Sequence, residues 1–495
     1  MKKSSKIILG STLLLVIIMA MVAGAAWGQE NTSTASAFTP QDVSVFTDYT
    51  NLPLLSNNYV FVSRPNAFGL QMPGNTGAAN PHYEYMAGSG ASWIRVPFQW
   101  KIIEPVLHNP AQYNWNSADT FTQAARPSQG GLKFIVTLGG NPDWASSLLN
   151  GPLYDPVGIN AYAAFVGAAV ERYDGDGIDD APGSPVVNYW EIYNEPDRGR
   201  YDSERRWGYD GDKYAELLEV LYPVVKAANP NAQLVFGGIA YDYFQNSDGS
   251  GGPFVRQFLD DVLAAGGGDF FDIMNFHFYP AYWWNWTSPQ SPGLLEKANF
   301  IKDKLAFYGF PNKPHLITEA GWHSNYHPVI PSDEETQARY VVELFTQAFA
   351  AGSEAMVWWQ LHDPLDAWIW MNGLTTLGDH SVPPDPKPSY TAFQTAVNEL
   401  GTADFHRILS DAETGSSSLE VYEFHDSIRS RTVFVAWTDP IHTTLLRPLR
   451  LPAPVAVVRN MYNVSHAVFD GDDGTVDGYV TVGVNGSPVY IEIDS

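Results

Sequence analysis

Short apolar runs alternate with segments of helical periodicity between about residues 66 and 360. Several runs are apolar at consecutive positions, as expected of parallel strands that are covered on both faces. In the intervening segments, such as "YAAFVGAAV" at 162–170, apolar residues recur every three or four positions, as on the buried face of a helix. The predicted strands are "AFGLQM" (67–72), "SWIRVPF" (92–98), "LKFIVTL" (132–138), "VVNYWEIY" (186–193), "AQLVFGGI" (232–239), "FDIMNFHF" (271–278), "PHLITEA" (314–320) and "EAMVWWQL" (354–361).

This alternation predicts an α/β fold, a (β/α)8 barrel built from eight strand-then-helix units. An open doubly wound sheet is the alternative, but no glycine-rich phosphate loop follows the first run. "KPSYTAFQTAVNEL" at 387–400 would be the last helix of the barrel. From about residue 401 onward, strand-like runs such as "RTVFVAW" and "PVYIEID" follow one another without a helical period, which predicts a C-terminal antiparallel β-sandwich.

The N-terminus combines lysines at positions 2, 3 and 6 with an apolar run that ends in small residues near Ala26 and Gly28. This pattern is typical of a secretory signal peptide, although the run is also long enough for an uncleaved membrane anchor. The polar, Ser/Thr-rich stretch that follows predicts a flexible tether. The expected organisation is a signal peptide or anchor at 1–28, a tether and lead-in at 29–57, the barrel at 58–400 and the accessory sandwich at 401–495.

Composition narrows the environment and the partners. The chain has no cysteine, so an exported protein would hold together without disulfides, which favours a prokaryotic secreted or cell-surface protein. Its net charge of −26 argues against a nucleic-acid partner, because phosphates would be repelled. Sixteen Trp, 26 Tyr and 26 Phe supply flat apolar faces with polar edges, most of them for the core.

Two glutamates stand at the ends of predicted barrel strands. Glu195, in "NYWEIYNEPD" at 188–197, ends the fourth strand, and Glu319, in "LITEAGW", ends the seventh. Functional groups of such barrels project from the C-terminal strand ends, and these two strands face each other across the mouth. One carboxylic acid there could protonate a glycosidic oxygen while the other carboxylate attacks the anomeric carbon. The structural alternative is that each glutamate merely pairs with a nearby cation.

The two motifs resemble those of the retaining glycoside hydrolases of clan A, which carry Asn-Glu on strand four and a nucleophilic Glu on strand seven. "GASWIRVPFQWKIIEP" at 90–105 and the trailing sandwich are most similar to family 39, with family 5 next. The resemblance implies that Glu195 is the general acid/base and Glu319 the nucleophile. The pKa of Glu195 should then be raised by partial burial and by the charge of Glu319, so that Glu195 starts protonated.

Further residues match polar positions of the clan. The resemblance implies that Asn194 hydrogen-bonds the sugar 2-hydroxyl and that Arg95 keeps the nucleophile ionised, although a purely structural ion pair would explain Arg95 equally well. His277 and Tyr279, in "NFHFYP" at the end of the sixth strand, match a His-x-Tyr pattern that places polar groups beside the nucleophile.

Aromatic residues near the strand ends are candidates for stacking on a sugar. Clan members commonly have a tryptophan after strand eight as the floor of the site, and we expect Trp358 at the floor and Trp359 in the core. Trp283, in the loop "YPAYWWNWTS", would form a sugar platform or simply cover the barrel. Trp144, in "GNPDWAS" after the third strand, is a similar candidate.

The acidic loop "YDGDGIDDAPGSP" at 173–185 could offer oxygen ligands to Ca²⁺ from Asp174, Asp176, Asp179 and Asp180. Its spacing lacks the terminal Glu of an EF-hand loop, so a solvated acidic turn is the preferred interpretation. The expected chemistry needs no metal or organic cofactor.

These features predict an exported retaining glycoside hydrolase that cleaves O-glycosidic bonds of β configuration in a carbohydrate substrate. A non-catalytic surface protein that binds carbohydrate on the same barrel is the alternative, because a fold alone does not settle function. The sugar, the linkage and the oligomeric state are left open by the sequence.

Overall fold

The computed structural model describes residues 66–72, 83–122, 132–199, 205–241, 253–280, 293–327, 330–364, 370–377, 383–439 and 441–494. The predicted signal peptide and tether lie outside these residues. Within the described ranges, no helix is both long and apolar enough to cross a membrane.

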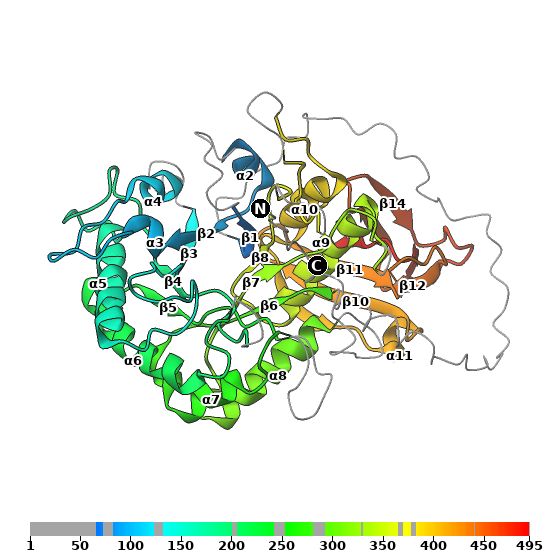
Figure 1. Ribbon diagram of the computed structural model, residues 1–495. Coiled ribbons are helices and arrows are strands. Elements are labelled where there is room, and N and C mark those ends of the chain that lie inside the picture. The colour runs from blue at the N-terminus through cyan, green and yellow to red at the C-terminus, as the bar shows by residue number, and fades with distance from the viewer. Residues whose placement is uncertain are drawn as a thin grey trace, which may run out of the picture. The chain divides into compact units, whose positions relative to one another are not determined.

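Eight parallel strands form a closed barrel, as predicted (Figure 1). Neighbouring strands pair in chain order, and β8 pairs with β1. Isolated parallel bridges from Val235 to Ile273 and from Ile239 to Phe276 join β5 to β6 and complete the ring. The strands are β1 (Phe68–Gln71), β2 (Trp93–Gln99), β3 (Lys133–Gly139), β4 (Tyr189–Ile192), β5 (Gln233–Val235), β6 (Met274–Phe278), β7 (His315–Ala320) and β8 (Met356–Trp358).

Helices lie outside the strands, and Figure 1 shows α5 to α8 following one another along the barrel. Asp155 caps α5 by accepting a hydrogen bond from the Val157 N–H, and Asp333 caps α9 in the same way from Thr336. The helices are α2 (Tyr83–Ser89), α3 (Trp100–Ile103), α4 (Asn116–Phe121), α5 (Pro156–Arg172), α6 (Gly211–Ala228), α7 (Phe258–Ala264), the 3-10 helix η3 (Gly267–Phe270), α8 (Leu294–Phe307), α9 (Glu334–Ala350) and α10 (Pro388–Leu400).

The C-terminal region is antiparallel, as predicted, with a six-stranded sheet in the order β14-β13-β16-β11-β10-β9 and a two-stranded sheet β12-β15. Leu449 of β12 and Val482 of β15 share an apolar core with Val421 and Ile491 of the larger sheet, so the two sheets enclose one core. The elements are β9 (Asp404–Ile408), α11 (Asp411–Thr414), β10 (Leu419–Asp426), β11 (Arg431–Thr438), β12 (Arg447–Leu451), β13 (Val455–Asn460), β14 (Ser465–Phe469), β15 (Val480–Val484) and β16 (Val489–Asp494).

The C-terminal sheets are joined to the last barrel helices by charged side chains. The buried Glu399 of α10 pairs with Arg431 of β11 at 2.7 Å and with Arg459 of β13 at 2.9 Å. Arg339 of α9 donates a hydrogen bond to the carbonyl of Ile441. The barrel and the sheets accordingly belong to one compact unit.

Buried acidic side chains gather at the same junction. Glu343 of α9 has no exposed surface, and neither of its carboxyl oxygens has a hydrogen-bond partner among the described residues. Burial, followed by the nearby Asp439 and Glu420, raises the pKa of Glu343 well above its usual range, while Arg339 opposes this only in part. Burial also raises the pKa of Asp439 to about 6. The environment of the junction therefore shifts the pKa of these carboxyl groups toward the protonated form.

Candidate active site

Arg95 of β2 stands at the centre of a buried charge network. Its Nε and Nη2 donate to the two carboxylate oxygens of Glu191 at 2.7 and 2.9 Å. Its Nη1 donates to Glu319 Oε1 at 2.7 Å, and Nη2 also donates to Asn194 Oδ1 at 2.7 Å. Burial alone would lower the pKa of Arg95, and the two carboxylates instead raise it above its ordinary value. One guanidinium thereby positions the ends of β4 and β7.

Glu191 of β4 is a site residue that the sequence analysis missed. It has no exposed surface, and it accepts hydrogen bonds from Thr137 Oγ1 at 2.7 Å and Asn275 Nδ2 at 3.0 Å in addition to those from Arg95. Burial would raise its pKa, but the charge and hydrogen bonds of Arg95 hold it below its usual range. The sequence does contain a sign of this residue, because Glu191 is a carboxylate in the middle of the apolar run "NYWEIY". A carboxylate buried in such a strand needs a cation beside it.

Glu319 lies at the end of β7 with a side chain that is 10% exposed. Its Oε1 faces Arg95, and its Oε2 accepts a hydrogen bond from the Tyr279 hydroxyl at 2.7 Å. Burial and the charge of Glu319 raise the pKa of Tyr279 well above its usual range, so the phenol stays protonated and keeps donating. The predicted neighbours Arg95 and Tyr279 are thus both brought to this carboxylate.

Glu195 follows the end of β4 in a backbone conformation that non-glycine residues seldom adopt, since the φ angles of Tyr193 and Glu195 are 59° and 45°. Tyr193 is fixed there because its N–H donates to the Leu138 carbonyl at 2.8 Å and its hydroxyl to Asn141 Oδ1 at 2.7 Å. Strained backbone of this kind is common at functional sites. It turns Glu195 toward the barrel mouth and toward His277.

The carboxylate of Glu195 is held by two partners. Arg206 donates to Oε2 at 2.9 Å, and the imidazole Nδ1 of His277 lies 3.3 Å from Oε1. Arg206 also donates to the carbonyl of Asn194 at 2.7 Å, which ties it to the same turn.

These partners correct the expectation of a raised pKa. Burial does raise the pKa of Glu195, but the hydrogen bond with His277 and then the charge of Arg206 outweigh burial and lower it to about 2. The expectation failed because it counted burial and Glu319 without a cation. Arg206 lies in the loop after β4, where no motif marked it.

His277 lies between the two glutamates, with Nδ1 3.3 Å from Glu195 and 3.6 Å from Glu319. Its Nε2 lies 3.1 Å from Thr318 Oγ1. Gly238, after β5, leaves room for this ring, because a Cβ atom at that position would lie 2.2 Å from His277 Nε2. The buried imidazole is therefore part of the site, as predicted.

A cleft of about 230 Å³ opens beside these groups. Its lining includes Arg95, Gln99, Asn150, Asn194, Glu319 and Trp359. Gln99 and Asn150 were not predicted. Gln99 is the last residue of β2, and Asn150 lies in the loop after β3. The polar residues of these segments have no recognisable spacing in the sequence.

The two tryptophans at the end of β8 have exchanged their predicted places. Trp358 has no exposed surface, belongs to the main apolar core and donates its Nε1–H to the Asn372 carbonyl at 2.9 Å. Trp359 is the one that lines the cleft, and its ring meets Tyr279 edge-on at 6.5 Å. Successive residues of an extended strand point to opposite sides, so only one of the pair can reach the cleft.

Of the other aromatic candidates, Trp144 is not brought to the cleft. Trp144 packs edge-on against Trp100 at 5.0 Å and donates to the Glu104 carbonyl at 3.2 Å, so it covers α3 and is not among the residues that line the cleft. Trp283 lies outside the described residues, and its predicted role stays a prediction.

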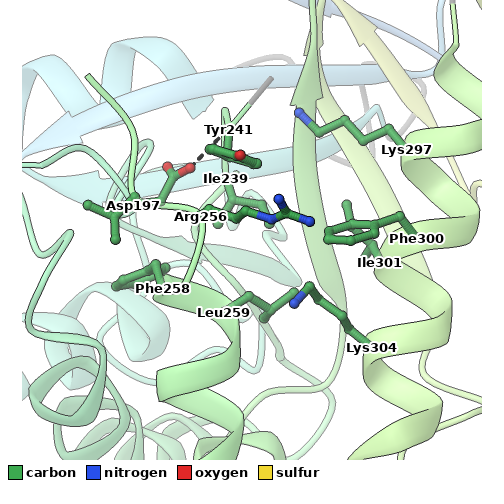
Figure 2. Close-up of a pocket in the computed structure, with 11 residues that line it drawn as sticks. Asp197, Ile239, Tyr241, Arg256, Phe258, Leu259, Lys297, Phe300, Ile301 and Lys304 are labelled. Carbon is green, nitrogen blue, oxygen red and sulfur yellow. Dashed lines mark hydrogen bonds between the residues drawn. The ribbon is translucent and has the colours of Figure 1, made fainter. Parts of the chain in front are cut away.

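A second, smaller cavity is lined by Asp197 of the turn after β4, among other residues, and is shown in Figure 2. The carboxylate of Asp197 lies on one side of it, where it accepts hydrogen bonds from the N–H groups of Ala240 and Tyr241, and side chains of α8 lie on the other. Burial, and less strongly the charge of Glu195, raises the pKa of Asp197 to about 7. The volume of about 20 Å³ suffices for a single water and not for a sugar. Through the hydrogen bonds from Ala240 and Tyr241, Asp197 links the turn that carries Glu195 to the segment after β5.

The acidic loop before β4 brings oxygens of Asp174, Asp176 and Asp180 within 4.8 Å of one another, without Asp179. Asp180 also accepts hydrogen bonds from the N–H groups of Gly175 at 3.2 Å and Gly177 at 3.0 Å. The loop is thus organised by its own backbone, and calcium binding there stays a prediction.

No protein-family model and no curated protein sequence matches the chain. Solved structures do match. A family 39 glycoside hydrolase from Bacteroides cellulosilyticus WH2 aligns with a TM-score of 0.64 and 22% identity, over 87% of this chain and 81% of that one. A monomeric β-xylosidase from Caulobacter crescentus CB15 aligns with a TM-score of 0.56 and 16% identity, over 88% and 97% of the two chains. The catalytic domain of the family 30 xylanase C from Talaromyces cellulolyticus aligns with a TM-score of 0.57 and 16% identity, over 87% and 97%. These structural neighbours are glycoside hydrolases, and at such identities the likeness establishes that this chain shares their fold.

Proposed function

We propose that the protein is an exported retaining glycoside hydrolase that cleaves β-O-glycosidic bonds of an oligo- or polysaccharide. The proposal is carried by the placement of Glu195 and Glu319, which have one oxygen each within 4.8 Å of the other and of a His277 nitrogen. Retaining enzymes hold their carboxyl groups about 5–5.5 Å apart, whereas inverting enzymes leave about 6.5–9.5 Å for a water molecule. Two oxygens within 4.8 Å of each other are compatible with the retaining arrangement.

Glu319 would act as the nucleophile. Arg95 and Tyr279 donate to different oxygens of Glu319, which stabilises the carboxylate and fixes its orientation. In the first step an electron pair of Glu319 forms the bond to the anomeric carbon, the bond to the leaving oxygen breaks, and Glu195 gives that oxygen a proton. In the second step Glu195 removes a proton from the water that attacks the glycosyl-enzyme, which regenerates both side chains.

Asn194 and Trp359 would position the sugar. The amide oxygen of Asn194 is held by Arg95, which leaves its nitrogen to donate to the sugar 2-hydroxyl. The indole of Trp359 lines the cleft beside Glu319 and offers a flat face for the C–H side of a pyranose.

The ion pair between Glu195 and Arg206 affects the pH range in which this cycle can run. Glu195 can serve as an acid only when it is protonated, and a pKa of about 2 leaves few protonated molecules at neutral pH. The value of kcat/KM reports the ionisation of the free enzyme, so we expect it to fall as the pH rises through the acidic range. The activity screen therefore has to extend to acidic pH.

A non-catalytic carbohydrate-binding protein is the second candidate, and one observation favours it. Arg206 donates to Oε2 of Glu195 at 2.9 Å and stabilises the ionised carboxylate, whereas a general acid has to be protonated at the start of the cycle. A binding protein would keep this pair permanently.

The test is a screen of aryl glycosides and polysaccharides between about pH 3 and pH 7, with β-xylosides first because the neighbours include a β-xylosidase and a xylanase. Glu319→Ala is the matched variant, and Trp144→Phe, outside the cleft, is the control. We expect turnover by the wild-type protein and by the control, and a loss of at least about 10³-fold in Glu319→Ala, as on removal of a nucleophile. Binding of sugar without turnover would favour the second candidate, and equal rates of wild type and Glu319→Ala would refute the mechanism.

A further inference from the structure

Three potential metal ligands lie together on the larger C-terminal sheet, away from the barrel mouth. His406 is on β9, and Glu423 and His425 are on β10. One donor atom from each residue lies within 4.8 Å of those of the other two. The edge strand β9 ends the sheet on this side, and the side chain of His425 is 48% exposed. An ion from solution can therefore reach the group.

The three donor atoms are close enough together for a metal site. The Nε2 of His425 lies 2.8 Å from Glu423 Oε1, and the rings of His406 and His425 are stacked with centroids 4.3 Å apart and planes at 20°. Two ligands of a tetrahedral zinc ion, each bonded at about 2.0–2.1 Å, lie roughly 3.3 Å from each other. The Glu423–His425 pair is already near this separation. The exposed His406 has to bring its donor atom closer by up to roughly 1.5 Å and to turn its ring out of the stack, so that both imidazole lone pairs point at one ion.

The sheet register explains why the three side chains meet. Glu423 and His425 are two apart on β10 and therefore project from the same face. Phe424 between them is fully buried on the opposite face, with the ring of Phe405 packed edge-on at 5.6 Å. Glu423 and His425 lie on the face of β10 that carries Val421, and His425 is at its exposed end. A β-bulge follows in β9, because Phe405 pairs with Phe424 and the next pair is Arg407 with Glu423, so His406 is the inserted residue.

The surrounding charges favour a cation. Arg407 donates to Glu423 Oε2 at 2.8 Å and pairs with Glu413 at 2.5 Å, so it orients the carboxylate through one oxygen and leaves the other for an ion. Asp404 stands opposite His425 in the sheet register. Two carboxylates thus pair with the Arg407 guanidinium, and a third stands across from His425.

We propose that His406, Glu423 and His425 bind one divalent transition-metal ion of the zinc type. Two imidazoles and one carboxylate suit zinc, nickel or copper, whereas calcium and magnesium prefer sets of oxygen ligands. Three protein ligands leave one tetrahedral position to a water molecule or to a donor from another molecule. Because the ion would tie the edge strand β9 to β10, its binding stabilises the folded protein by mass action. This inference does not depend on the proposed enzymatic function.

The test is a calorimetric titration of the purified protein with ZnCl₂ at pH 7, paired with the thermal midpoint at each zinc concentration. We expect saturable binding by the wild type, a rise in its midpoint, and at least about tenfold weaker binding in both His406→Ala and His425→Ala. Equal midpoints without zinc would show that the variants are folded, which their exposed positions favour. His466→Ala, on the opposite edge strand β14, is the control and keeps wild-type binding.

A second variant separates this group from the barrel mouth, where Glu195, His277 and Glu319 also have donor atoms within 4.8 Å of one another. Glu319→Gln should bind zinc as the wild type does. The proposal is overturned if the double variant His406→Ala/His425→Ala binds zinc with wild-type affinity and stoichiometry, or if Glu319→Gln or His466→Ala removes the binding instead.

Discussion

Replacing Arg206 by Gln should raise the pKa of Glu195 and move the pH dependence of catalysis. The present pKa of about 2, against an ordinary 4.5, corresponds to roughly 3 kcal/mol in favour of the carboxylate. The hydrogen bond with His277 is the larger cause and Arg206 the next. The side chains of Arg206 and Glu195 are only 14% and 15% exposed, so solvent screens their attraction little. An adjacent arginine lowers a carboxyl pKa by about 1–3, so we expect the pKa of Glu195 in Arg206→Gln to be about 1–2 higher than in the wild type.

The assay is kcat/KM as a function of pH on two aryl glycosides of the sugar found in the screen. Activity is lost as the general acid deprotonates, so a higher pKa moves the alkaline limb of the profile upward, here by about 1–2 pH units. The shift should appear with a phenyl glycoside, whose leaving group needs a proton, and hardly affect glycosylation by a 2,4-dinitrophenyl glycoside, whose leaving group does not. Arg206→Lys, which keeps the charge, is the control. An active Arg206→Gln protein with an unmoved alkaline limb would refute this reasoning.

Three further predictions concern the fold and the cleft. Glu343→Gln should have the same free energy of unfolding in urea as the wild type at pH 4 and a higher one at pH 8. A carboxyl group with a raised folded-state pKa contributes stability below its unfolded pKa and loses this contribution as the pH rises through the folded pKa. Glu334→Gln, on the exposed side of α9, should leave the free energy of unfolding unchanged at both pH values. Glu191→Gln should lower the free energy of unfolding by about 3–5 kcal/mol, since it leaves a buried guanidinium short of charge, and a loss below about 1 kcal/mol would contradict that role. Trp359→Ala should raise KM with little change in thermal midpoint, whereas Trp358→Ala should destabilise by about 3–5 kcal/mol, and the reverse result would restore the original assignment of the two rings.

The barrel could be predicted because its strands are covered on both faces. Such strands appear in the sequence as continuous apolar runs. Six of the eight runs contain the whole observed strand, and β2 and β3 each extend one residue past the predicted run. The strands of the C-terminal sheets that were not predicted, β9, β12 and β14, are mostly exposed: β12 has two buried residues, and β9 and β14 have none. Their stability comes from pairing with a neighbour, and a single sequence does not show that neighbour.

The candidate site divides in the same way. Glu195 and Glu319 could be placed because a carboxylate at the end of a barrel strand has a fixed position in the fold. Arg206 could not be placed, because the course of the loop after β4 determines which residue it contacts, and a loop has no regular period in the sequence. The order of Trp358 and Trp359 depends on where β8 ends, and a boundary error of one residue reverses which ring faces the cleft.

The central claim is that Glu319 forms a covalent bond to the sugar. It is tested most directly by incubating the protein with a 2-deoxy-2-fluoro glycoside that carries a good leaving group and measuring the mass of the protein and of its peptides. The account predicts a stable increase by one fluoroglycosyl group, located on Glu319 and absent from Glu319→Ala. An active protein that gains no mass and releases the inverted anomer would contradict it.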